Sequence, residues 1–358
     1  MNALQPAEAR PNPVPLFRLR GVQKYFPIEG GLLKRTIGQV RAVDGIDLDV
    51  FPGESIGIVG ESGCGKSTLG RVILRLLEPT GGTIEITDRH GDFVNITDMD
   101  RSQLRVFRKR AQMIFQDPRS SLNSRMTIGE LIKEPLVIHK LLGSDNGNRR
   151  LYELMEMVGL PRGMENRFPH EVSGGQRQRI GIARALALDP EVIICDEAVS
   201  ALDVSVQAQV LNLLKRLQKQ LQLTFLFISH DLGVIRHFCN RVAVLYLGRV
   251  VEVAETSHLF ENPMHPYTKA LLSAIPRPGV KGAEGRILLT GDIPSPSNPP
   301  PGCHFHTRCW AVREECKTCV PALKAVDEHH THQAACHFAG NIPEWKGDNF
   351  MENEGQSK

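Results

Sequence analysis

The sequence has no apolar run of the roughly 18 to 20 residues that a membrane-spanning helix requires. Its first residues, MNALQPAEARPNP, are polar and proline-rich and lack the apolar core of a signal peptide. We therefore expect the chain to stay in the cytoplasm. The formal net charge of +3 over 358 residues is too small to indicate, by itself, a surface for nucleic acid or lipid. With 41% hydrophobic and 23% charged residues, the composition is that of a globular protein of two domains, or of one large domain with an appendage.

What the sequence does contain is a phosphate-binding pattern. Residues 60–68 read GESGCGKST, follow the apolar run SIGIV, and open a helix predicted over 69–77. The pattern G-x-x-x-x-G-K-[ST] between a strand and a helix turns backbone N–H groups and a helix N-terminus toward a phosphate chain. Lys66 is then expected to reach the β- and γ-phosphates, and the Ser67 hydroxyl to ligate Mg²⁺. The alternative is a chance match in a glycine-rich turn, but the preceding strand and the following helix argue against it. The predicted nucleotide-binding residues of the loop are Gly60, Glu61, Ser62, Gly63, Cys64, Gly65, Lys66, Ser67 and Thr68.

Polar residues also end three other predicted strands. Gln116 follows the strand 111–115, Asp196 and Glu197 follow the strand 192–195, and His230 comes shortly after the strand 224–228. In a parallel α/β sheet the ligand binds at the carboxyl ends of the strands, so these side chains are expected beside the phosphate loop. Asp196 can hold the Mg²⁺ shell, Glu197 can polarise a water, and Gln116 can reach the metal or the water. A contact between His230 and the γ-phosphate is one interpretation, and a structural histidine is the other.

Two further segments precede predicted helices. VSGGQ at 172–176 opens a helix over 176–188, which forms a second anion-binding N-terminus, although a simple N-cap by Ser173 fits the same spacing. SALD at 200–203 leads into a helix over 204–221.

Alternating patterns near the N-terminus predict two antiparallel strands over 16–25 and 40–50, joined by a polar, glycine-rich surface loop over 29–38. Phe26, or else Tyr25, can lie under an adenine ring, and core packing is the alternative for either ring.

Residues 117–170 show helical periodicity over 128–136 and 151–158 and carry chain breakers at Pro118, Pro135, Gly159 and Pro161. We interpret them as a helical insertion in the nucleotide domain.

In this order the motifs resemble those of the ATP-binding subunit of an ABC transporter. GESGCGKST matches its Walker A motif, Gln116 its Q-loop, VSGGQ its signature, VIICDE at 192–197 its Walker B motif, SALD its D-loop and His230 its switch histidine. Val172 departs from the leucine that is commoner at the start of the signature. The resemblance implies an α/β fold: a P-loop ABC ATPase core, with a RecA-like parallel sheet and an antiparallel β-subdomain, together with a helical subdomain.

The resemblance also implies a mechanism. Two such subunits face head to tail, so that ATP on Lys66 of one is closed over by Ser173 and Gly175 of the other. The implied catalytic residues are Glu197, His230, Lys66 and Gln116, and the implied Mg²⁺ ligands are Ser67, Gln116 and Asp196. Nucleotide contacts outside the Walker A loop are implied for Phe26, Gln116, Ser173, Gly174, Gly175, Gln176, Asp196 and Asp203.

The tail narrows the family. ENPMHPYTKALLSAIP at 261–276 and PSPSNPPPGCHFHTRC at 294–309 are similar to the ATPase subunits of oligopeptide and dipeptide importers, a family that also includes nickel and glutathione importers. The resemblance implies ATP-driven peptide import from a peripheral position on the cytoplasmic face of the inner membrane. Implied partners are a second, related ATPase subunit, two membrane permeases that dock on the helical insertion, and, indirectly, an extracytoplasmic substrate-binding protein.

Two other interpretations compete with this one. A soluble ABC protein that acts on nucleic acid or the ribosome is disfavoured, because there is one cassette and no sustained heptad pattern between Thr68 and Ser173; we expect no nucleic-acid partner. A regulatory module with a degenerate cassette is disfavoured because Lys66, Glu197 and His230 are all present.

Five of the eight cysteines crowd into one C-terminal segment: Cys303, Cys309, Cys316, Cys319 and Cys336. In a reducing compartment this indicates a metal site before disulfides. Four thiolates suit a 4Fe-4S cluster or Zn²⁺, and His304, His306, His332 and His337 keep a mixed zinc site open, as does a segment without metal. The family resemblance implies a 4Fe-4S cluster on Cys303, Cys309, Cys316 and Cys336, with Cys319 as an alternative ligand. We expect a structural role, since so short a segment lacks a large core of its own.

The predicted organisation is therefore a flexible leader (1–15), a nucleotide-binding domain (16–260) with its helical subdomain at about 117–170, a family-specific helix and proline-rich linker (261–302), a Cys-rich metal-binding segment (303–340) and a flexible tail (341–358).

Overall fold

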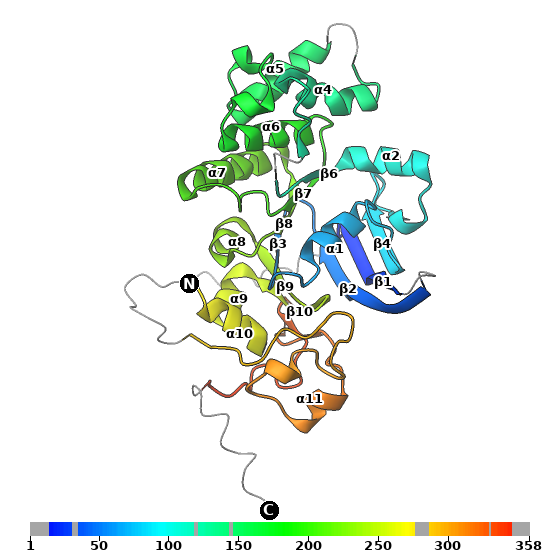
Figure 1. Cartoon of the computed structure of the whole chain (residues 1–358), viewed down its shortest axis with the longest axis vertical. Coiled ribbons are helices and arrows are strands. Elements are labelled where there is room, and N and C mark those ends of the chain that lie inside the picture. The colour runs from blue at the N-terminus through cyan, green and yellow to red at the C-terminus, as the bar shows by residue number, and fades with distance from the viewer. Residues whose placement is uncertain are drawn as a thin grey trace, which may run out of the picture.

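The computed structural model describes residues 14–30, 35–117, 121–142, 146–275, 286–328 and 331–345. The described chain is elongated, with a group of helices at one end, two sheets in the middle and the C-terminal segment at the other end (Figure 1). Most of the predicted leader and tail, and the predicted breaker Pro118, lie outside the described residues. No helix in these ranges is both long and apolar enough to span a membrane.

The central sheet is mixed, with the strand order β11-β12-β10-β9-β3-β8-β7-β6. Its parallel part consists of β3 (Ser55–Val59), β6 (Ala111–Ile114), β7 (Val192–Asp196), β8 (Thr224–Ile228) and β9 (Arg241–Tyr246). Antiparallel strands extend one edge: β10 (Arg249–Glu255), β11 (Lys324–Ala325) and β12 (Gln333–Ala334). β3, β7 and β8 are buried along their whole length, as their continuous apolar runs require of strands covered on both faces. The predicted parallel sheet is therefore confirmed.

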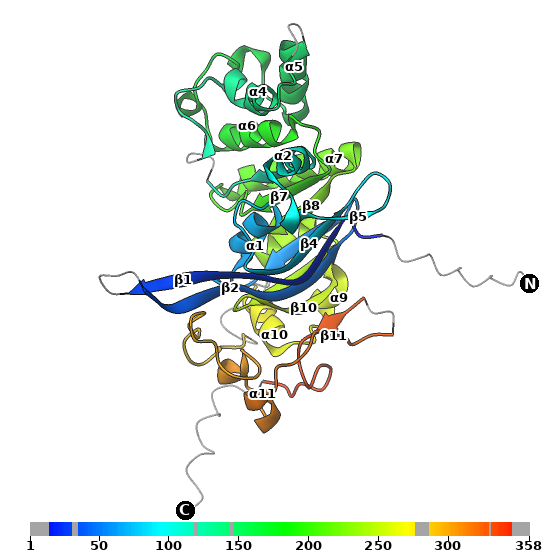
Figure 2. The ribbon, with the colours of Figure 1, turned by 90° about the vertical axis from the view of Figure 1, so that its right-hand side faces the viewer.

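A second, antiparallel sheet has the order β2-β1-β4-β5 and consists of β1 (Phe17–Gly30), β2 (Arg35–Val50), β4 (Gly81–Thr87) and β5 (Phe93–Asn95). The predicted loop over 29–38 is wrong, because Glu29 pairs with Thr36 and the two strands form a long projecting hairpin (Figure 2). Polar and glycine residues occur here because both faces of the two-stranded ribbon are open to solvent; even Ile37 is 71% exposed. Composition alone does not separate such a ribbon from a loop.

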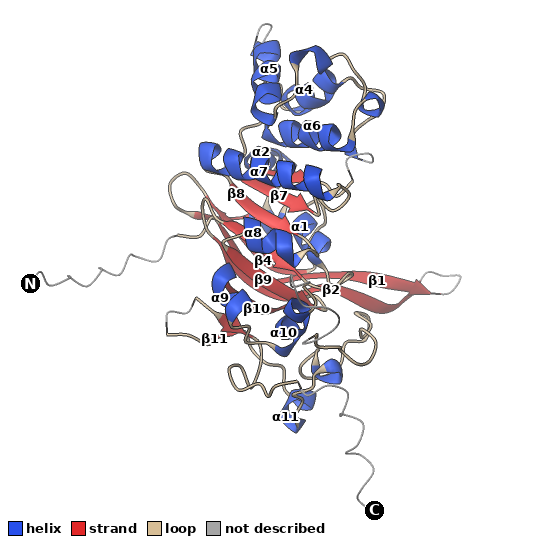
Figure 3. Cartoon of the chain, turned by 90° about the vertical axis from the view of Figure 1, so that its left-hand side faces the viewer, coloured by secondary structure: helices blue, strands red, loops and turns tan. Residues whose placement is uncertain are grey.

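Helix α1 (Lys66–Ile73) lies between the two sheets. Its Leu69, Val72 and Ile73 share a buried core with Phe17 of β1 and Ile56 of β3. The other face of the central sheet is covered by α7 (Val204–Leu221) and α8 (Leu232–Phe238) (Figure 3). The phosphate loop at the start of α1 is therefore held between two layers.

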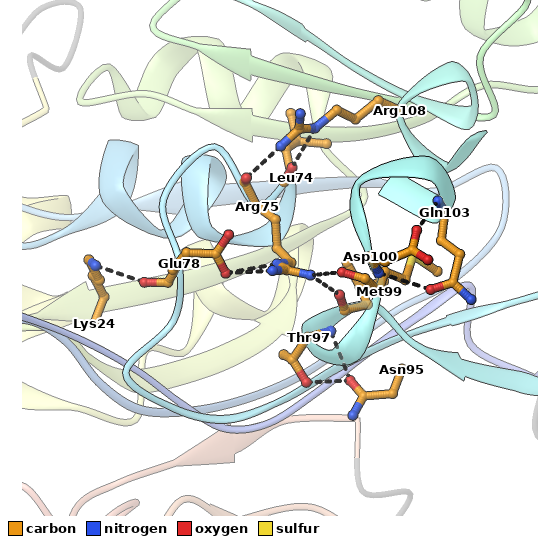
Figure 4. Close-up of polar contacts among 11 residues, drawn as sticks. Lys24, Leu74, Arg75, Glu78, Asn95, Thr97, Met99, Asp100, Gln103 and Arg108 are labelled. Atoms are coloured by element: carbon orange, nitrogen blue, oxygen red, sulfur yellow. Dashed lines mark hydrogen bonds and ion pairs between the residues drawn. The ribbon is translucent and has the colours of Figure 1, made fainter. Parts of the chain in front are cut away.

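The C-terminal end of α1 is anchored by two arginines. Arg75 donates to the Glu78 carboxylate at 2.9 Å and to the Met99 carbonyl at 2.7 Å, and Arg108 of α2 (Arg101–Arg110) donates to the Arg75 carbonyl at 2.6 Å (Figure 4). The capping box of Asp100 and Gln103 starts α2. These bonds join the end of α1 to α2 and to the turn that precedes it.

The helical layer consists of α4 (Ile128–Ile138), α5 (Asn146–Val158) and α6 (Gly174–Leu186), whose buried apolar faces share the main core. The predicted breaker Pro135 is wrong, since it lies inside α4. Pro135 and Leu136 are both buried, and His139 N–H still bonds to the Pro135 carbonyl at 3.0 Å. Burial of this face offsets the one backbone hydrogen bond that proline removes.

The C-terminal segment packs on the nucleotide domain. Its helices are α9 (Thr256–Glu261), α10 (Pro266–Ser273) and α11 (Glu314–Thr318), and it contains a 3₁₀ turn at His306–Arg308. Other 3₁₀ turns lie earlier in the chain, at Ile96–Asp98, Arg162–Met164 and Pro169–Glu171. Strand β12 pairs with β10, and the Arg41 N–H donates to the Pro296 carbonyl at 3.0 Å. The fully buried Phe305 joins the main core, with its ring 5.2 Å from that of Tyr246. The segment thus shares the core of the nucleotide domain.

Candidate nucleotide site

The phosphate loop leaves no room for side chains at two glycines. A Cβ at Gly65, where φ is 101°, would lie 1.9 Å from the Ala42 carbonyl oxygen, and a Cβ at Gly60 would lie 2.2 Å from that of Leu245. No side chain caps the N-terminus of α1, so its first N–H groups are available to an anion. The loop therefore fits a chain of phosphates.

Lys66 lies at the start of α1 with 5% of its surface exposed. Its ammonium donates to the carbonyls of Gly60 at 2.8 Å and Glu61 at 2.9 Å. A buried ammonium held over the loop provides the positive charge that β- and γ-phosphates need.

Ser67 and Asp196 face each other at the end of β7. The Ser67 hydroxyl donates to the Asp196 carboxylate at 2.6 Å, and Arg71 lies 3.9 Å from the other carboxylate oxygen. Burial raises the pKa of Asp196, while Ser67 and Arg71 partly oppose that rise. A hydroxyl and a carboxylate at this separation are two of the oxygen ligands that Mg²⁺ takes beside phosphates.

Glu197 brings together the residues that follow β6, β7 and β8. One of its carboxylate oxygens accepts from the Gln116 side-chain amide at 2.8 Å and lies 3.3 Å from Nδ1 of His230. Glu197 also has a left-handed backbone, with φ of 47°, which is unusual for a non-glycine residue and aims the carboxylate at the shared edge of the strands. Gln116 thus donates to Glu197 in this structure, whereas the hydrogen bond between Ser67 and Asp196 does not include it.

Ser173 and its neighbours lie apart from the phosphate loop. Ser173 is the exposed N-cap of α6, bonded to Gln176 in both directions, and α6 lies in the helical layer, away from α1 (Figure 1). The hydrogen bonds of the described chain join none of residues 173–176 to residues 60–68. Asp203 likewise caps α7 by accepting from Val206 N–H at 3.0 Å, and this bond lowers its pKa. Both groups present exposed helix N-termini.

The two aromatic candidates have separate environments. The Tyr25 hydroxyl donates to Asp44, which also accepts from Arg249 at 2.8 Å. Phe26 is half-buried, with the Lys24 ammonium 5.0 Å from its ring centre. Tyr25 is therefore held by its hydrogen bond to Asp44, so Phe26 is the better candidate for stacking on an adenine ring.

Two residues that touch the loop were missed by sequence reasoning. The Tyr267 hydroxyl accepts from the Glu61 N–H at 2.8 Å, and Arg308 donates to both oxygens of the Glu61 carboxylate at 2.8 and 3.0 Å. Both lie in the tail, more than 200 residues from Glu61. The pattern around each residue carries no local signal for this contact.

Four cysteines of the C-terminal segment line one small cavity. They are Cys303, Cys309, Cys316 and Cys336, and His306 and His337 also reach the cavity. Cys319 is exposed and does not line it, and His332 instead contacts the buried Glu252 at 2.7 Å. All eight cysteines are free thiols, and within the described ranges no three metal-binding side chains are close enough to hold an ion. The structure thus gathers the four predicted cysteines without closing them around a single metal.

The chain matches two families of known proteins. Residues 43–200 match the family described as ABC transporter, and residues 251–316 match that described as Oligopeptide/dipeptide transporter, C-terminal region. The fold resembles the dimeric structure of a post-hydrolysis state of the ATP-binding cassette MJ0796 bound to ADP and Pi. That likeness has a TM-score of 0.58 and 30% identity and covers 67% of this chain and 98% of that one. Fold and site together define an ABC-type ATPase.

Relatives narrow the class. The oligopeptide transport ATP-binding protein AppF of Bacillus subtilis (strain 168) is 50% identical over 326 residues, which is 90% of this chain and 97% of the relative. The probable peptide ABC transporter ATP-binding protein y4tS of Sinorhizobium fredii is 47% identical over 322 residues, 90% of this chain and 89% of the relative. The chain belongs to the family of ATP-binding proteins of oligopeptide and peptide ABC transporters.

Proposed function

We propose that this chain hydrolyses ATP to power the import of di- or oligopeptides across the cytoplasmic membrane, as one of two ATPase subunits of a transporter. The observation that carries the proposal is the meeting of Lys66, the Ser67–Asp196 pair and Glu197 at the shared edge of the strands. The peptide-transport names of its relatives and the match of its tail support the cargo class.

The residues divide the work of hydrolysis. Lys66 and the N–H groups at the start of α1 bind the phosphates and stabilise the charge that develops on them. Ser67 and Asp196 would hold Mg²⁺, which supplies charge neutralisation between the β- and γ-phosphates. Glu197 accepts the proton of the attacking water, and Gln116 and His230 orient its carboxylate.

A second subunit completes the site. Ser173 and the following glycines form an exposed helix N-terminus that, within the described chain, makes no hydrogen bond to the phosphate loop. In a head-to-tail pair this N-terminus faces the γ-phosphate held by the partner's loop. We propose that the partner is a related ATPase chain.

A groove between the helical layer and β6 is the proposed docking site for a membrane permease. Its volume is about 380 Å³, and it is lined by Leu76, Phe115, Pro135 and Ile138 among others. Phe115 is 38% exposed and Ile138 is 54% exposed, so both present apolar surface to a partner. Phe115 directly precedes Gln116, whose side-chain amide donates to Glu197 at 2.8 Å, so the proposed docking groove adjoins the proposed catalytic residues. A larger cavity, at the amino ends of β6, β7 and β8, lies away from the loop.

The four cysteines that line the C-terminal cavity are the proposed ligands of a 4Fe-4S cluster. Burial raises the pKa of Cys303 to about 11 and that of Cys309 to about 12, so these groups are neutral thiols until a cationic group displaces their protons. The gathering of four cysteines around one cavity supports this proposal, because four thiolates suit a 4Fe-4S cluster; they also suit Zn²⁺, which is the alternative. The proposed role of the cluster is structural. Anaerobic purification tests this: a brown sample with iron and sulfide supports the cluster, and a colourless sample that contains zinc contradicts it.

The transport proposal is tested by co-expression with the cognate permeases, the partner ATPase and the binding protein. We expect the chain to co-purify with the permeases in detergent and its ATP hydrolysis to rise with peptide-loaded binding protein. Ile138→Asp should abolish co-purification, whereas Val320→Asp, a control that is also 54% exposed but lies outside the groove, should not. Stimulation by nickel or glutathione in place of peptide would contradict the cargo, and a stable soluble complex with nucleic acid would contradict the transporter.

A further inference from the structure

Glu61, the second residue of the phosphate loop, is held from three directions. Its N–H donates to the Tyr267 hydroxyl at 2.8 Å, and its carbonyl accepts from Lys66 at 2.9 Å. Its carboxylate accepts two parallel hydrogen bonds from Arg308 at 2.8 and 3.0 Å. Two of these three contacts come from the C-terminal tail.

The bond between Arg308 and Glu61 is protected from solvent. The Arg308 side chain is 7% exposed, and the Glu61 side chain is 24% exposed. Burial is the largest single effect and disfavours the charged guanidinium, but the interactions with Glu61 and Tyr246 together more than offset it, so the pKa of Arg308 lies above its ordinary value. A forked, buried pair of this kind fixes the relative orientation of the two groups, in contrast to a single-point surface pair.

The tail residues are themselves rigidly held. Tyr267 is fully buried, and its ring lies 4.7 Å from that of Tyr246 and 5.4 Å from that of Phe305. Arg308 ends the 3₁₀ turn His306–Arg308, which lies between Cys303 and Cys309 in the chain. Arg308 is therefore the neighbour in the chain of Cys309, one of the cysteines that line the cavity.

We propose that Arg308 and Tyr267 are positioning residues for nucleotide binding, through which the Cys-rich segment sets the conformation of the phosphate loop. The inference rests on the ATP site proposed above and goes beyond it, because it assigns part of the affinity for nucleotide to the tail. Both residues bond to the loop at Glu61, so they act through the orientation of the loop's N–H groups and of Lys66.

The test is a double-mutant cycle on the full-length chain, read out as the Kd for a fluorescent ADP, mant-ADP. Arg308→Gln and Glu61→Gln should each weaken binding by about tenfold, and the double variant should be no weaker than either, because both changes remove one link. Arg308→Lys keeps the charge but loses the two parallel hydrogen bonds, so its Kd should lie between those of the wild-type chain and Arg308→Gln. Tyr267→Phe removes only the hydroxyl and should weaken binding in an otherwise unchanged core.

The control is Arg110→Gln, which breaks a forked bond to Glu191 of the same chemistry, at 2.8 and 2.7 Å, away from the loop. Its Kd should stay within twofold of wild type, and circular dichroism checks that every variant is folded. A folded Arg308→Gln chain with wild-type affinity would overturn the inference, and so would effects of Arg308→Gln and Glu61→Gln that multiply in the double variant. If the wild-type chain itself failed to bind mant-ADP, the proposed ATP site would fall instead.

Discussion

Replacement of Glu197 by glutamine tests the catalytic assignment. The Glu197 carboxylate accepts from the Gln116 amide at 2.8 Å and lies 3.3 Å from Nδ1 of His230, with the side chain 16% exposed. Glutamine keeps the shape and one acceptor oxygen but loses the negative charge that takes the proton of the attacking water. Loss of a positioned general base costs about 10²- to 10⁴-fold in rate, or roughly 3 to 5 kcal/mol of barrier.

Steady-state phosphate release by the assembled ATPase pair measures this effect. We expect the Glu197→Gln chain to lose hydrolysis within that range while its affinity for mant-ATP stays within about threefold of wild type, since Lys66 and the loop are untouched. The free energy of unfolding should change by less than about 0.5 kcal/mol, because glutamine can adopt the same left-handed backbone. Wild-type turnover in the variant would refute the assignment of Glu197 as the base. Loss of nucleotide binding together with turnover would refute the division of roles between Glu197 and Lys66.

Three further predictions follow from single contacts. Gly65→Ala places a Cβ 1.9 Å from the Ala42 carbonyl oxygen at a φ of 101°. In urea denaturation it should lower the free energy of unfolding by at least about 2 kcal/mol, and it should abolish nucleotide binding. A stable variant that binds nucleotide would contradict the geometry. For Asp44, burial raises the pKa, but Tyr25 and Arg249 lower it more, to below its ordinary 3.8; Asp44→Asn should therefore be less stable than wild type at pH 7. The difference should shrink below about pH 3.8 as the carboxylate is protonated in the folded wild type, and a difference independent of pH would show that the charge does not matter. In a metal-free sample at pH 8, iodoacetamide should label the exposed Cys319 before Cys303 and Cys309, because burial raises the pKa values of these two thiols to about 11 and about 12. Mass spectrometry that found Cys303 and Cys309 labelled first would contradict the packing of the segment.

The sequence allowed prediction of those parts of the site that depend on local chemistry. The loop from Gly60 to Thr68 needs glycines and a lysine at fixed spacing, and Asp196 and Glu197 follow a strand whose apolar run is itself a signal. Their convergence with Gln116 and His230 then follows from the shared edge of a parallel sheet.

The contacts that the tail makes with the phosphate loop and with β10 could not be predicted from the sequence. Arg308 and Glu61 are 247 residues apart, and His332 and Glu252 are 80 apart, so their pairing depends on how β12 and Phe305 dock on the nucleotide domain. No periodicity or motif records such a docking. Pro135 illustrates the converse, because a local breaker signal was overridden by burial in the helical layer.

Uptake of a labelled peptide tests directly whether ATP bound on this chain powers peptide import. The transporter is reconstituted in ATP-loaded proteoliposomes with its binding protein, with either the wild-type chain or a Lys66→Ala chain. We expect peptide accumulation with the wild-type chain and background uptake with the variant, because the Lys66 ammonium held over the loop is the proposed phosphate-binding group. Undiminished accumulation with Lys66→Ala would show that ATP bound on this chain does not power import.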